Sequence, residues 1–133
     1  LKTALAEFAH EYATREVAVI GINSNDADTH PEDGREAMVG DITEFGYAFP
    51  YVVDATQAVA KAYRAACTPD FYVFDADLRL VYRGRFDESR PESDVPVNGR
   101  DLRAAVDTPT GEQKASIGCN IKWKPGNEPN YSG

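Results

Sequence analysis

The stretch that most constrains the fold is 65–86, which contains two short β-rich segments joined by an aspartate-bearing turn. The first segment, Phe71–Phe74, is apolar, and the second is the alternating run Leu80–Arg83. Two such segments around a four-residue turn predict an antiparallel hairpin. Proline cannot donate a ladder hydrogen bond, so Pro69 is expected just before the first strand, where an X-Pro bond is a candidate for the cis isomer. Leu78 stands where such turns usually carry glycine, so we expect the turn to avoid a positive φ there.

Helix and strand patterns alternate along the rest of the chain. An amphipathic helix is expected over residues 1–13, and the apolar run Val17–Ile22 predicts a parallel strand covered on both faces. Pro50–Val53 predicts a second strand. The further expectations are a helix lined by Met38, Val39, Ile42 and Phe45 and ended by Gly46; a capping box of Asp54 and Gln57; and a helix capped by Asn98 and stopped by Pro109. This alternation predicts an α/β sandwich with a mixed sheet flanked by helices.

Several motifs resemble the peroxiredoxin-like (AhpC/TSA, redoxin) branch of the thioredoxin fold. They are GINSND (21–26), PED (31–33), CTPDFYVFDADLRLVYRGRFD (67–87) and SIGCNIKWKPGNEP (116–129), and the resemblance covers nearly the whole chain. It implies a thioredoxin-like domain over residues 1–109, followed by a tail over 110–133 that packs on the domain. It also implies that the family's N-terminal strand and active-site cysteine would precede residue 1. We therefore expect the sequence to be truncated before that cysteine.

By this resemblance, the parent protein would be a thiol-based oxidoreductase that reduces a peroxide or a disulfide, with a thiol reductant protein as its partner. The chain alone is then expected to be inactive, since the nucleophile would lie upstream. No cofactor is implied. The alternative is a non-catalytic thioredoxin-fold binding module that holds a partner in a groove at Thr68-Pro69.

Four residues are candidates for a site. Cys67 and Cys119 are each a candidate resolving thiol, and each is alternatively a small packed side chain. A disulfide between them stays open, because sequence does not set their distance. Thr68 and Pro69 are the candidate substrate-binding residues, since in the family the backbone beside the cis proline pairs with the substrate's extended chain.

Charge and composition exclude some other functions. A net charge of -8 argues against a general nucleic-acid surface and against an anionic membrane surface. The acidic loop with Asp26, Asp28, His30, Glu32 and Asp33 is expected to cap the next helix and stay solvated rather than bind a metal. Arg85 has a thiolate-stabilising analogue in peroxiredoxins, but charge balance with Asp75, Asp77, Asp87 and Glu88 is the preferred interpretation of the arginines around the hairpin. A cytoplasmic location is favoured, although a signal would lie outside this sequence; the oligomeric state is left open.

Overall fold

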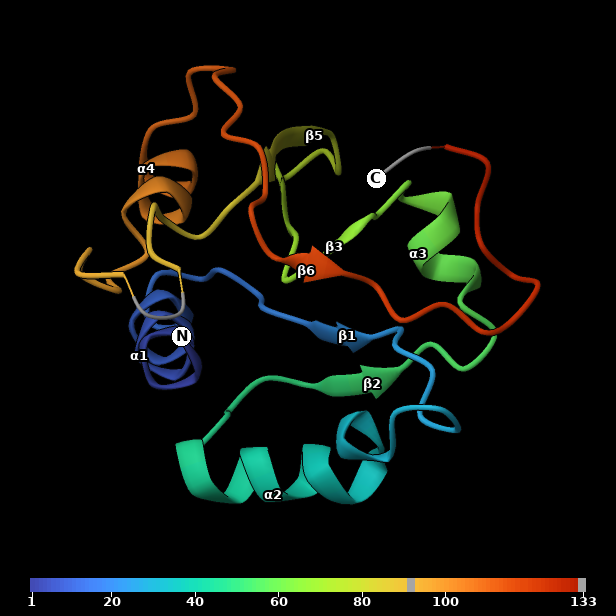
Figure 1. The fold of residues 1–133 in the computed structure, drawn as a ribbon. Coiled ribbons are helices and arrows are strands. Elements are labelled where there is room, and N and C mark those ends of the chain that lie inside the picture. The colour runs from blue at the N-terminus through green and yellow to red at the C-terminus, as the bar shows by residue number, and fades with distance from the viewer. Residues whose placement is uncertain (91–92, 132–133) are drawn as a thin grey trace. The chain divides into compact units, whose positions relative to one another are not determined.

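The computed structural model describes residues 1–90 and 93–131, and its helices and strands fall into two compact units (Figure 1). One unit is made of Leu1–Ala66 and the segment that begins at Ile121; the other is Cys67–Asn120. The expected division into a domain over 1–109 and a tail over 110–133 stays a prediction. No helix in the described part of the chain is long and apolar enough to cross a membrane.

The first unit contains α1 (Lys2–Ala13), β1 (Gly21–Asn23), the 3-10 turn η1 (Pro31–Asp33), α2 (Arg35–Phe45), β2 (Tyr51–Val53) and α3 (Ala58–Ala62). Helix α1 is amphipathic, as predicted: Phe8 and Tyr12 are buried, and their rings stack with centroids 4.3 Å apart. The predicted end of α2 is confirmed, because Gly46 takes the left-handed conformation there, at φ 69°. Glycine favours this position because it lacks the Cβ atom that makes the conformation costly. Met38 is buried in α2, but Val39, predicted on the same inner face, is exposed.

Strands β1 and β2 are parallel, with Gly21 opposite Tyr51 and Asn23 opposite Val53 (Figure 1). The prediction of a strand over Val17–Ile22 covered on both faces is wrong. Only Gly21–Asn23 pairs, and Ile20 and Ile22 are 63% and 45% exposed. Successive side chains of a strand point to opposite faces of the sheet, and the exposure of Ile22 shows that its face of β1 is not covered.

The predicted capping box before α3 is half right. Asp54 does cap the helix, since its carboxylate accepts the backbone N–H of Val59 at 3.2 Å and of Ala60 at 2.9 Å. A carboxylate in this position satisfies N–H groups that have no partner within the helix. Gln57 does not complete the box. It takes φ 65°, and its fully buried side chain binds Ser24 and the C-terminal segment instead.

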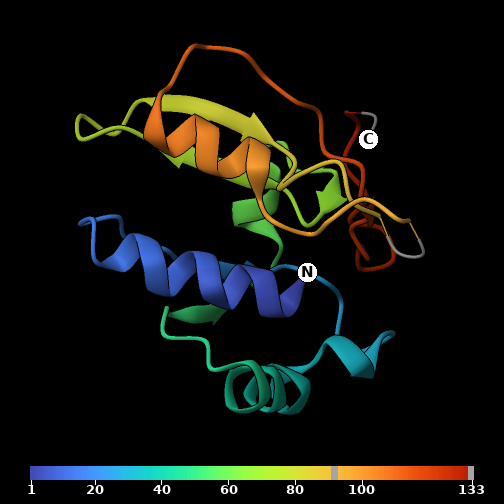
Figure 2. The ribbon, with the colours of Figure 1, turned by 90° about the vertical axis from the view of Figure 1, so that its left-hand side faces the viewer.

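The second unit contains β3 (Cys67–Thr68), β4 (Phe71–Phe74), β5 (Leu80–Gly84), α4 (Arg100–Asp107) and β6 (Cys119–Asn120). The predicted hairpin is confirmed, with Tyr72 opposite Arg83 in an antiparallel β4–β5 pair. Helix α4 packs alongside the hairpin (Figure 2) and ends before Pro109, as expected.

The turn of the hairpin corrects one prediction: Leu78 has a positive φ of 61°. The Asp75 carboxylate accepts the N–H groups of Asp77 and Arg79 at 2.9 and 3.0 Å, and the Asp75 carbonyl accepts the N–H of Leu78. These bonds fix the turn around the position. The Leu78 side chain clashes with little, because the residue is 82% exposed. The turn therefore tolerates a conformation that costs a non-glycine residue roughly 1–2 kcal/mol.

The loop before α4 is organised by a buried carboxylate rather than by the predicted Asn98 cap alone. The Asp87 side chain accepts the N–H groups of Asn98 and Gly99, both at 2.8 Å. Gly99, at φ 71°, is the N-cap residue, while the Asn98 side chain accepts the N–H of Arg100 at 3.0 Å. Burial by itself would raise the Asp87 pKa, but hydrogen bonds from Ser89, Gly99 and Asn98 outweigh it and the pKa is lowered.

Candidate functional site

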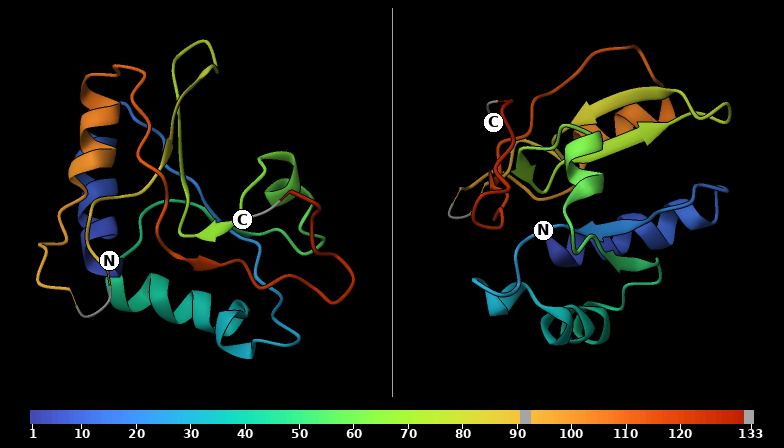
Figure 3. Two further views of the ribbon diagram at one scale, coloured as in Figure 1. Left: turned by 45° about the horizontal axis from the view of Figure 1, so that its top comes forward. Right: turned by 90° about the vertical axis from the view of Figure 1, so that its right-hand side faces the viewer.

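Residues 67–69 lead from strand β3 into β4, and the Thr68–Pro69 peptide bond is cis. Cys67, Thr68 and Pro69 are all half-buried. Strand β6 runs antiparallel beside β3, so that Cys67 lies opposite Asn120 and Thr68 opposite Cys119 (Figure 3). The second unit thus brings all four residues singled out in the sequence into one small piece of sheet.

Asp70 follows the cis proline directly, and its carboxylate is shared by three other side chains. Its Oδ2 atom lies 3.3 Å from Arg83 Nη2 and accepts the Tyr72 hydroxyl at 3.1 Å. Its Oδ1 atom accepts the Ser116 hydroxyl at 2.5 Å. The Arg83 guanidinium also lies over the Tyr72 ring, 5.4 Å from its centroid, in a cation–π contact. With its side chain 6% exposed, Asp70 is a buried junction between the cis-proline loop, β5 and the C-terminal segment.

The two cysteines differ in environment. Burial raises the pKa of the Cys67 thiol, and the Asp70 charge raises it further, while Arg83 acts in the opposite direction. A raised pKa disfavours the thiolate, so this environment makes Cys67 a weaker nucleophile than an unperturbed cysteine. Cys119 is exposed, and both cysteines are free thiols. Residues directly opposite in an antiparallel pair share a face, so the β3–β6 register places these two cysteines on opposite faces.

Two of the arginines near the hairpin, Arg83 and Arg85, are engaged in ion pairs. Arg85 binds Asp101 through Nε at 2.6 Å and Glu88 through Nη2 at 3.7 Å. The hydrogen bond to Asp101 is the main cause that raises the Arg85 pKa. Pairing with Glu88 agrees with the charge-balance interpretation. The sequence did not indicate that Asp101 is the nearer ion-pair partner of Arg85, or that Asp70 and Ser116 are hydrogen-bonded to each other. These contacts join residues far apart in the chain, so they leave no local pattern in the sequence.

In the acidic loop of the first unit, Asp28 and Glu32 are exposed as predicted, but Asp26 is not. Asp26 is 2% exposed and accepts the Thr29 hydroxyl at 2.8 Å and the Lys124 ammonium at 3.2 Å. The Thr29 hydrogen bond, opposed by burial and aided by Lys124, lowers the Asp26 pKa. Over residues 1–90 and 93–131, no three His, Cys, Asp or Glu side chains gather closely enough to hold a metal ion. Asp26 instead anchors the C-terminal segment.

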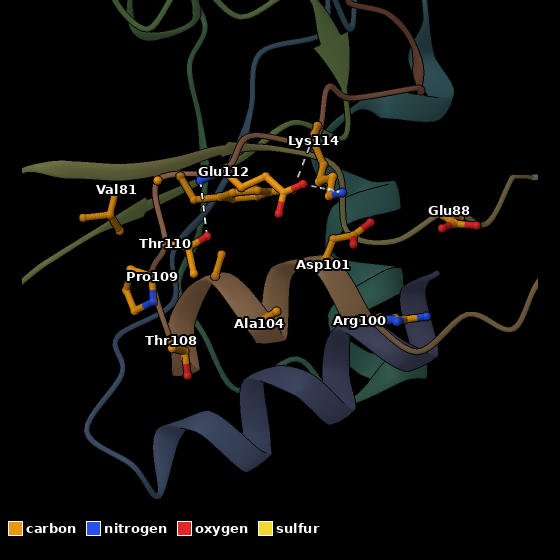
Figure 4. A pocket seen from close by; sticks show the side chains of 13 residues that line it. Val81, Glu88, Arg100, Asp101, Ala104, Thr108, Pro109, Thr110, Glu112 and Lys114 are labelled. Carbon is orange, nitrogen blue, oxygen red and sulfur yellow. Dashed lines mark hydrogen bonds and ion pairs between the residues drawn. The ribbon is translucent and has the colours of Figure 1, made fainter.

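A cavity of about 330 Å³ lies in the second unit among β5, α4 and the loop 108–114 (Figure 4). Its charged lining residues are Glu88, Arg100, Asp101, Glu112 and Lys114. All three carboxylates are already paired: Asp101 with Arg85 at 2.6 Å, Glu88 with Arg85 at 3.7 Å, and Glu112 with Lys114 at 2.7 Å. Because these charges offset each other locally, the cavity offers no activated group, and the candidate chemistry stays with the cis-proline loop.

The parallel strand pair, the cis-proline loop and the following hairpin with its helix are elements of a thioredoxin-like α/β fold. The family model of the AhpC/TSA family matches residues 2–83, and the chain belongs to that family.

Two solved structures are similar over nearly all of the chain. A hypothetical protein from Sinorhizobium meliloti 1021 is 51% identical, with a TM-score of 0.90; the match covers 94% of this chain and 72% of that one. An uncharacterized conserved protein from Geobacillus kaustophilus is 52% identical, with a TM-score of 0.88; the match covers 93% of this chain and 69% of that one. No curated protein matches. The family points to the thioredoxin-like peroxidase or oxidoreductase class, and the two relatives add no specific activity.

Proposed function

We propose that the chain is part of a thiol-based oxidoreductase that reduces a peroxide or a disulfide. The observation that carries the proposal is the Thr68–Pro69 loop of an AhpC/TSA chain, paired with a strand that presents an exposed thiol. Thr68 and Pro69 are the proposed substrate-binding residues. Their part is to offer backbone groups to an extended partner chain.

The proposed chemistry has two steps. A thiolate attacks one oxygen of the peroxide, becomes a sulfenic acid and releases an alkoxide or hydroxide, which takes up a proton. A second thiol then attacks the sulfenic sulfur, which forms a disulfide and releases water, and a thiol reductant protein restores both thiols. With a disulfide substrate, the thiolate attacks one sulfur, the substrate's S–S bond breaks, and a mixed disulfide forms while the other sulfur leaves as a thiolate that takes up a proton. The second thiol then attacks the mixed disulfide, forms the enzyme disulfide and releases the remaining substrate thiol.

Within this scheme Cys119 is the better candidate for the second thiol, because it is exposed and lies opposite Thr68. Cys67 suits attack less well, since burial and the Asp70 charge raise its pKa and so disfavour the thiolate. The proposal therefore assigns the attacking thiolate to a cysteine outside these 133 residues. The solved relatives contain chain beyond the matched part, with 72% and 69% of their lengths covered.

The test compares peroxide and disulfide reduction by the 133-residue chain and by the longer protein that contains it. We expect turnover from the longer protein only. C119S in the longer protein should keep a single burst of peroxide consumption but lose steady turnover, whereas C67S should keep both. Robust Cys67-dependent turnover by the short chain would make Cys67 the nucleophile. If neither form shows turnover and P69A weakens binding of a partner, the result would favour the non-catalytic binding module. The observation behind this alternative function is the raised pKa of Cys67.

A further inference from the structure

The segment 113–120 runs along two edges of the second unit (Figure 3). Beside β5, the Gln113 side-chain oxygen accepts the backbone N–H of Arg83 at 2.6 Å. The Lys114 carbonyl then accepts the backbone N–H of Arg85 at 2.8 Å. Further on, the segment becomes β6 and pairs with β3. It therefore covers backbone groups of β5 and β3 in the way an added strand would.

Gly118 brings this segment against the Thr68–Pro69 peptide itself. A Cβ atom added to Gly118 would lie 2.8 Å from the Thr68 carbonyl carbon and 3.1 Å from Pro69 N, and closer still to the Thr68 carbonyl oxygen. These atoms are backbone, so they have no side-chain freedom with which to move aside. Gly118 has no positive φ, and the constraint is space alone. Only glycine fits at this contact.

Polar contacts dominate how the segment is held. Ser116 binds Asp70 at 2.5 Å, which links the segment to the residue after Pro69. Ile117 is only half-buried, and Gly118, Cys119 and Asn120 are not buried either. Without a fully buried apolar anchor between 113 and 120, most of the attachment comes from hydrogen bonds that water can replace. Such a segment opens more readily than the hairpin beneath it.

We propose that residues 113–120 form a displaceable strap, which in the resting chain occupies the backbone edge where an extended peptide of a partner protein binds. The strap's own contacts define that partner: an extended segment with a hydrogen-bond donor that reaches Asp70, followed two residues later by a glycine at the Thr68–Pro69 peptide. The strap thereby regulates access to the site of the proposed function. The identity of the partner as a thiol substrate rests on that function, but peptide binding does not.

The test uses a fluorescent synthetic peptide with the sequence of residues 112–122 and serine in place of Cys119, so that no thiol chemistry contributes. Its binding to the 133-residue chain is followed by fluorescence anisotropy. The wild-type chain should bind weakly, because its own strap competes. G118A in the protein displaces the strap and should tighten binding about tenfold or more, as expected when the binding-competent fraction rises by that factor. S116A should fall between the two.

Two matched controls accompany these variants. A peptide that carries G118A should not bind any form of the protein, and T43A on exposed α2 should bind like the wild type. Failure of both G118A and S116A chains to bind the unmodified peptide would overturn the proposal. If G118A does not fold, the proposal is tested by peptide binding to S116A and by hydrogen exchange of the wild-type chain. The backbone amides of residues 113–120 must then exchange faster than those of β4 and β5, and equal protection of the two sets would refute the strap. Loss of redox turnover leaves this test unaffected, so the two proposals fail separately.

Discussion

The side chain of Gln57 offers the sharpest test of how the first unit is held together. It is fully buried, and both ends of its amide group are hydrogen-bonded. The amide nitrogen donates to the carbonyls of Ser24 at 2.7 Å and Lys122 at 2.9 Å. The amide oxygen accepts the N–H of Lys124 at 3.0 Å and the side-chain amide of Asn127 at 2.8 Å. Q57A removes these bonds and leaves the backbone groups of Ser24, Lys122 and Lys124 without this partner.

The expected loss follows from these groups. A net hydrogen bond contributes about 1 kcal/mol, and a buried group left unsatisfied costs about 1–3 kcal/mol. The Lys122 carbonyl also accepts the backbone N–H of Asp26 at 2.7 Å, so only the Ser24 carbonyl and the Lys124 N–H are left unsatisfied. Two such groups imply that Q57A lowers the free energy of unfolding by roughly 3 kcal/mol. The backbone adds a second effect, since Gln57 has φ 65°. Q57G loses the same bonds but tolerates this conformation, so it should be about 1 kcal/mol more stable than Q57A.

Urea unfolding of the wild-type chain, Q57A, Q57G and Q57E measures these differences. Q57E keeps the shape and the acceptor oxygen but places a carboxylate oxygen against the carbonyls of Ser24 and Lys122, so it should be at least as damaging as Q57A. A55S, at an exposed neighbouring position, is the control and should change stability by less than about 0.5 kcal/mol. Hydrogen exchange at the Lys124 amide should quicken in Q57A. A Q57A chain as stable as the wild type, with Lys124 still protected, would refute the network as a source of stability.

Three more predictions concern charge and the hairpin turn. D70N should lower the Cys67 pKa, because it removes a charge that raises that pKa and leaves Arg83 unopposed. In a C119S background, iodoacetamide should then alkylate Cys67 at a lower pH than in the chain with Asp70. The control D77N, at the exposed turn, should not change the pH at which alkylation begins. Because the Asp26 pKa is lowered in the folded chain, its stabilisation is complete above its ordinary value of 3.8 and is lost as the pH falls through the lowered value. Acid titration of stability in the wild-type chain and D26N should show this difference, and parallel curves would contradict it. Leu78 holds a positive φ that glycine accepts freely. L78G should therefore stabilise the chain by about 1 kcal/mol in thermal unfolding; an unchanged or lower midpoint would show that the turn carries no such strain.

Local patterns were sufficient for the elements whose stabilising contacts lie close in sequence. The β4–β5 hairpin, the helix of residues 2–13 and the glycine end of α2 depend on neighbours within a few positions, and each was predictable from residue type and spacing. The resemblance carried by the CTPDF motif supplied the family. The family indicated by the motif and the hairpin observed after Pro69 therefore agree with each other.

The candidate site in the second unit and the Gln57 network in the first depended instead on residues far apart in the chain. Asp70 meets Ser116 across 46 positions, and Gln57 meets Lys124 across 67. Local propensity predicted Gln57 as a capping residue, but a buried amide gains more from satisfying orphaned backbone groups of the C-terminal segment than from an exposed helix end. For the same reason the sequence named Cys67, Thr68, Pro69 and Cys119 separately. Only the tertiary structure, by pairing β6 with β3, decided that they share one edge, because strand pairing over such a separation leaves no periodicity to read.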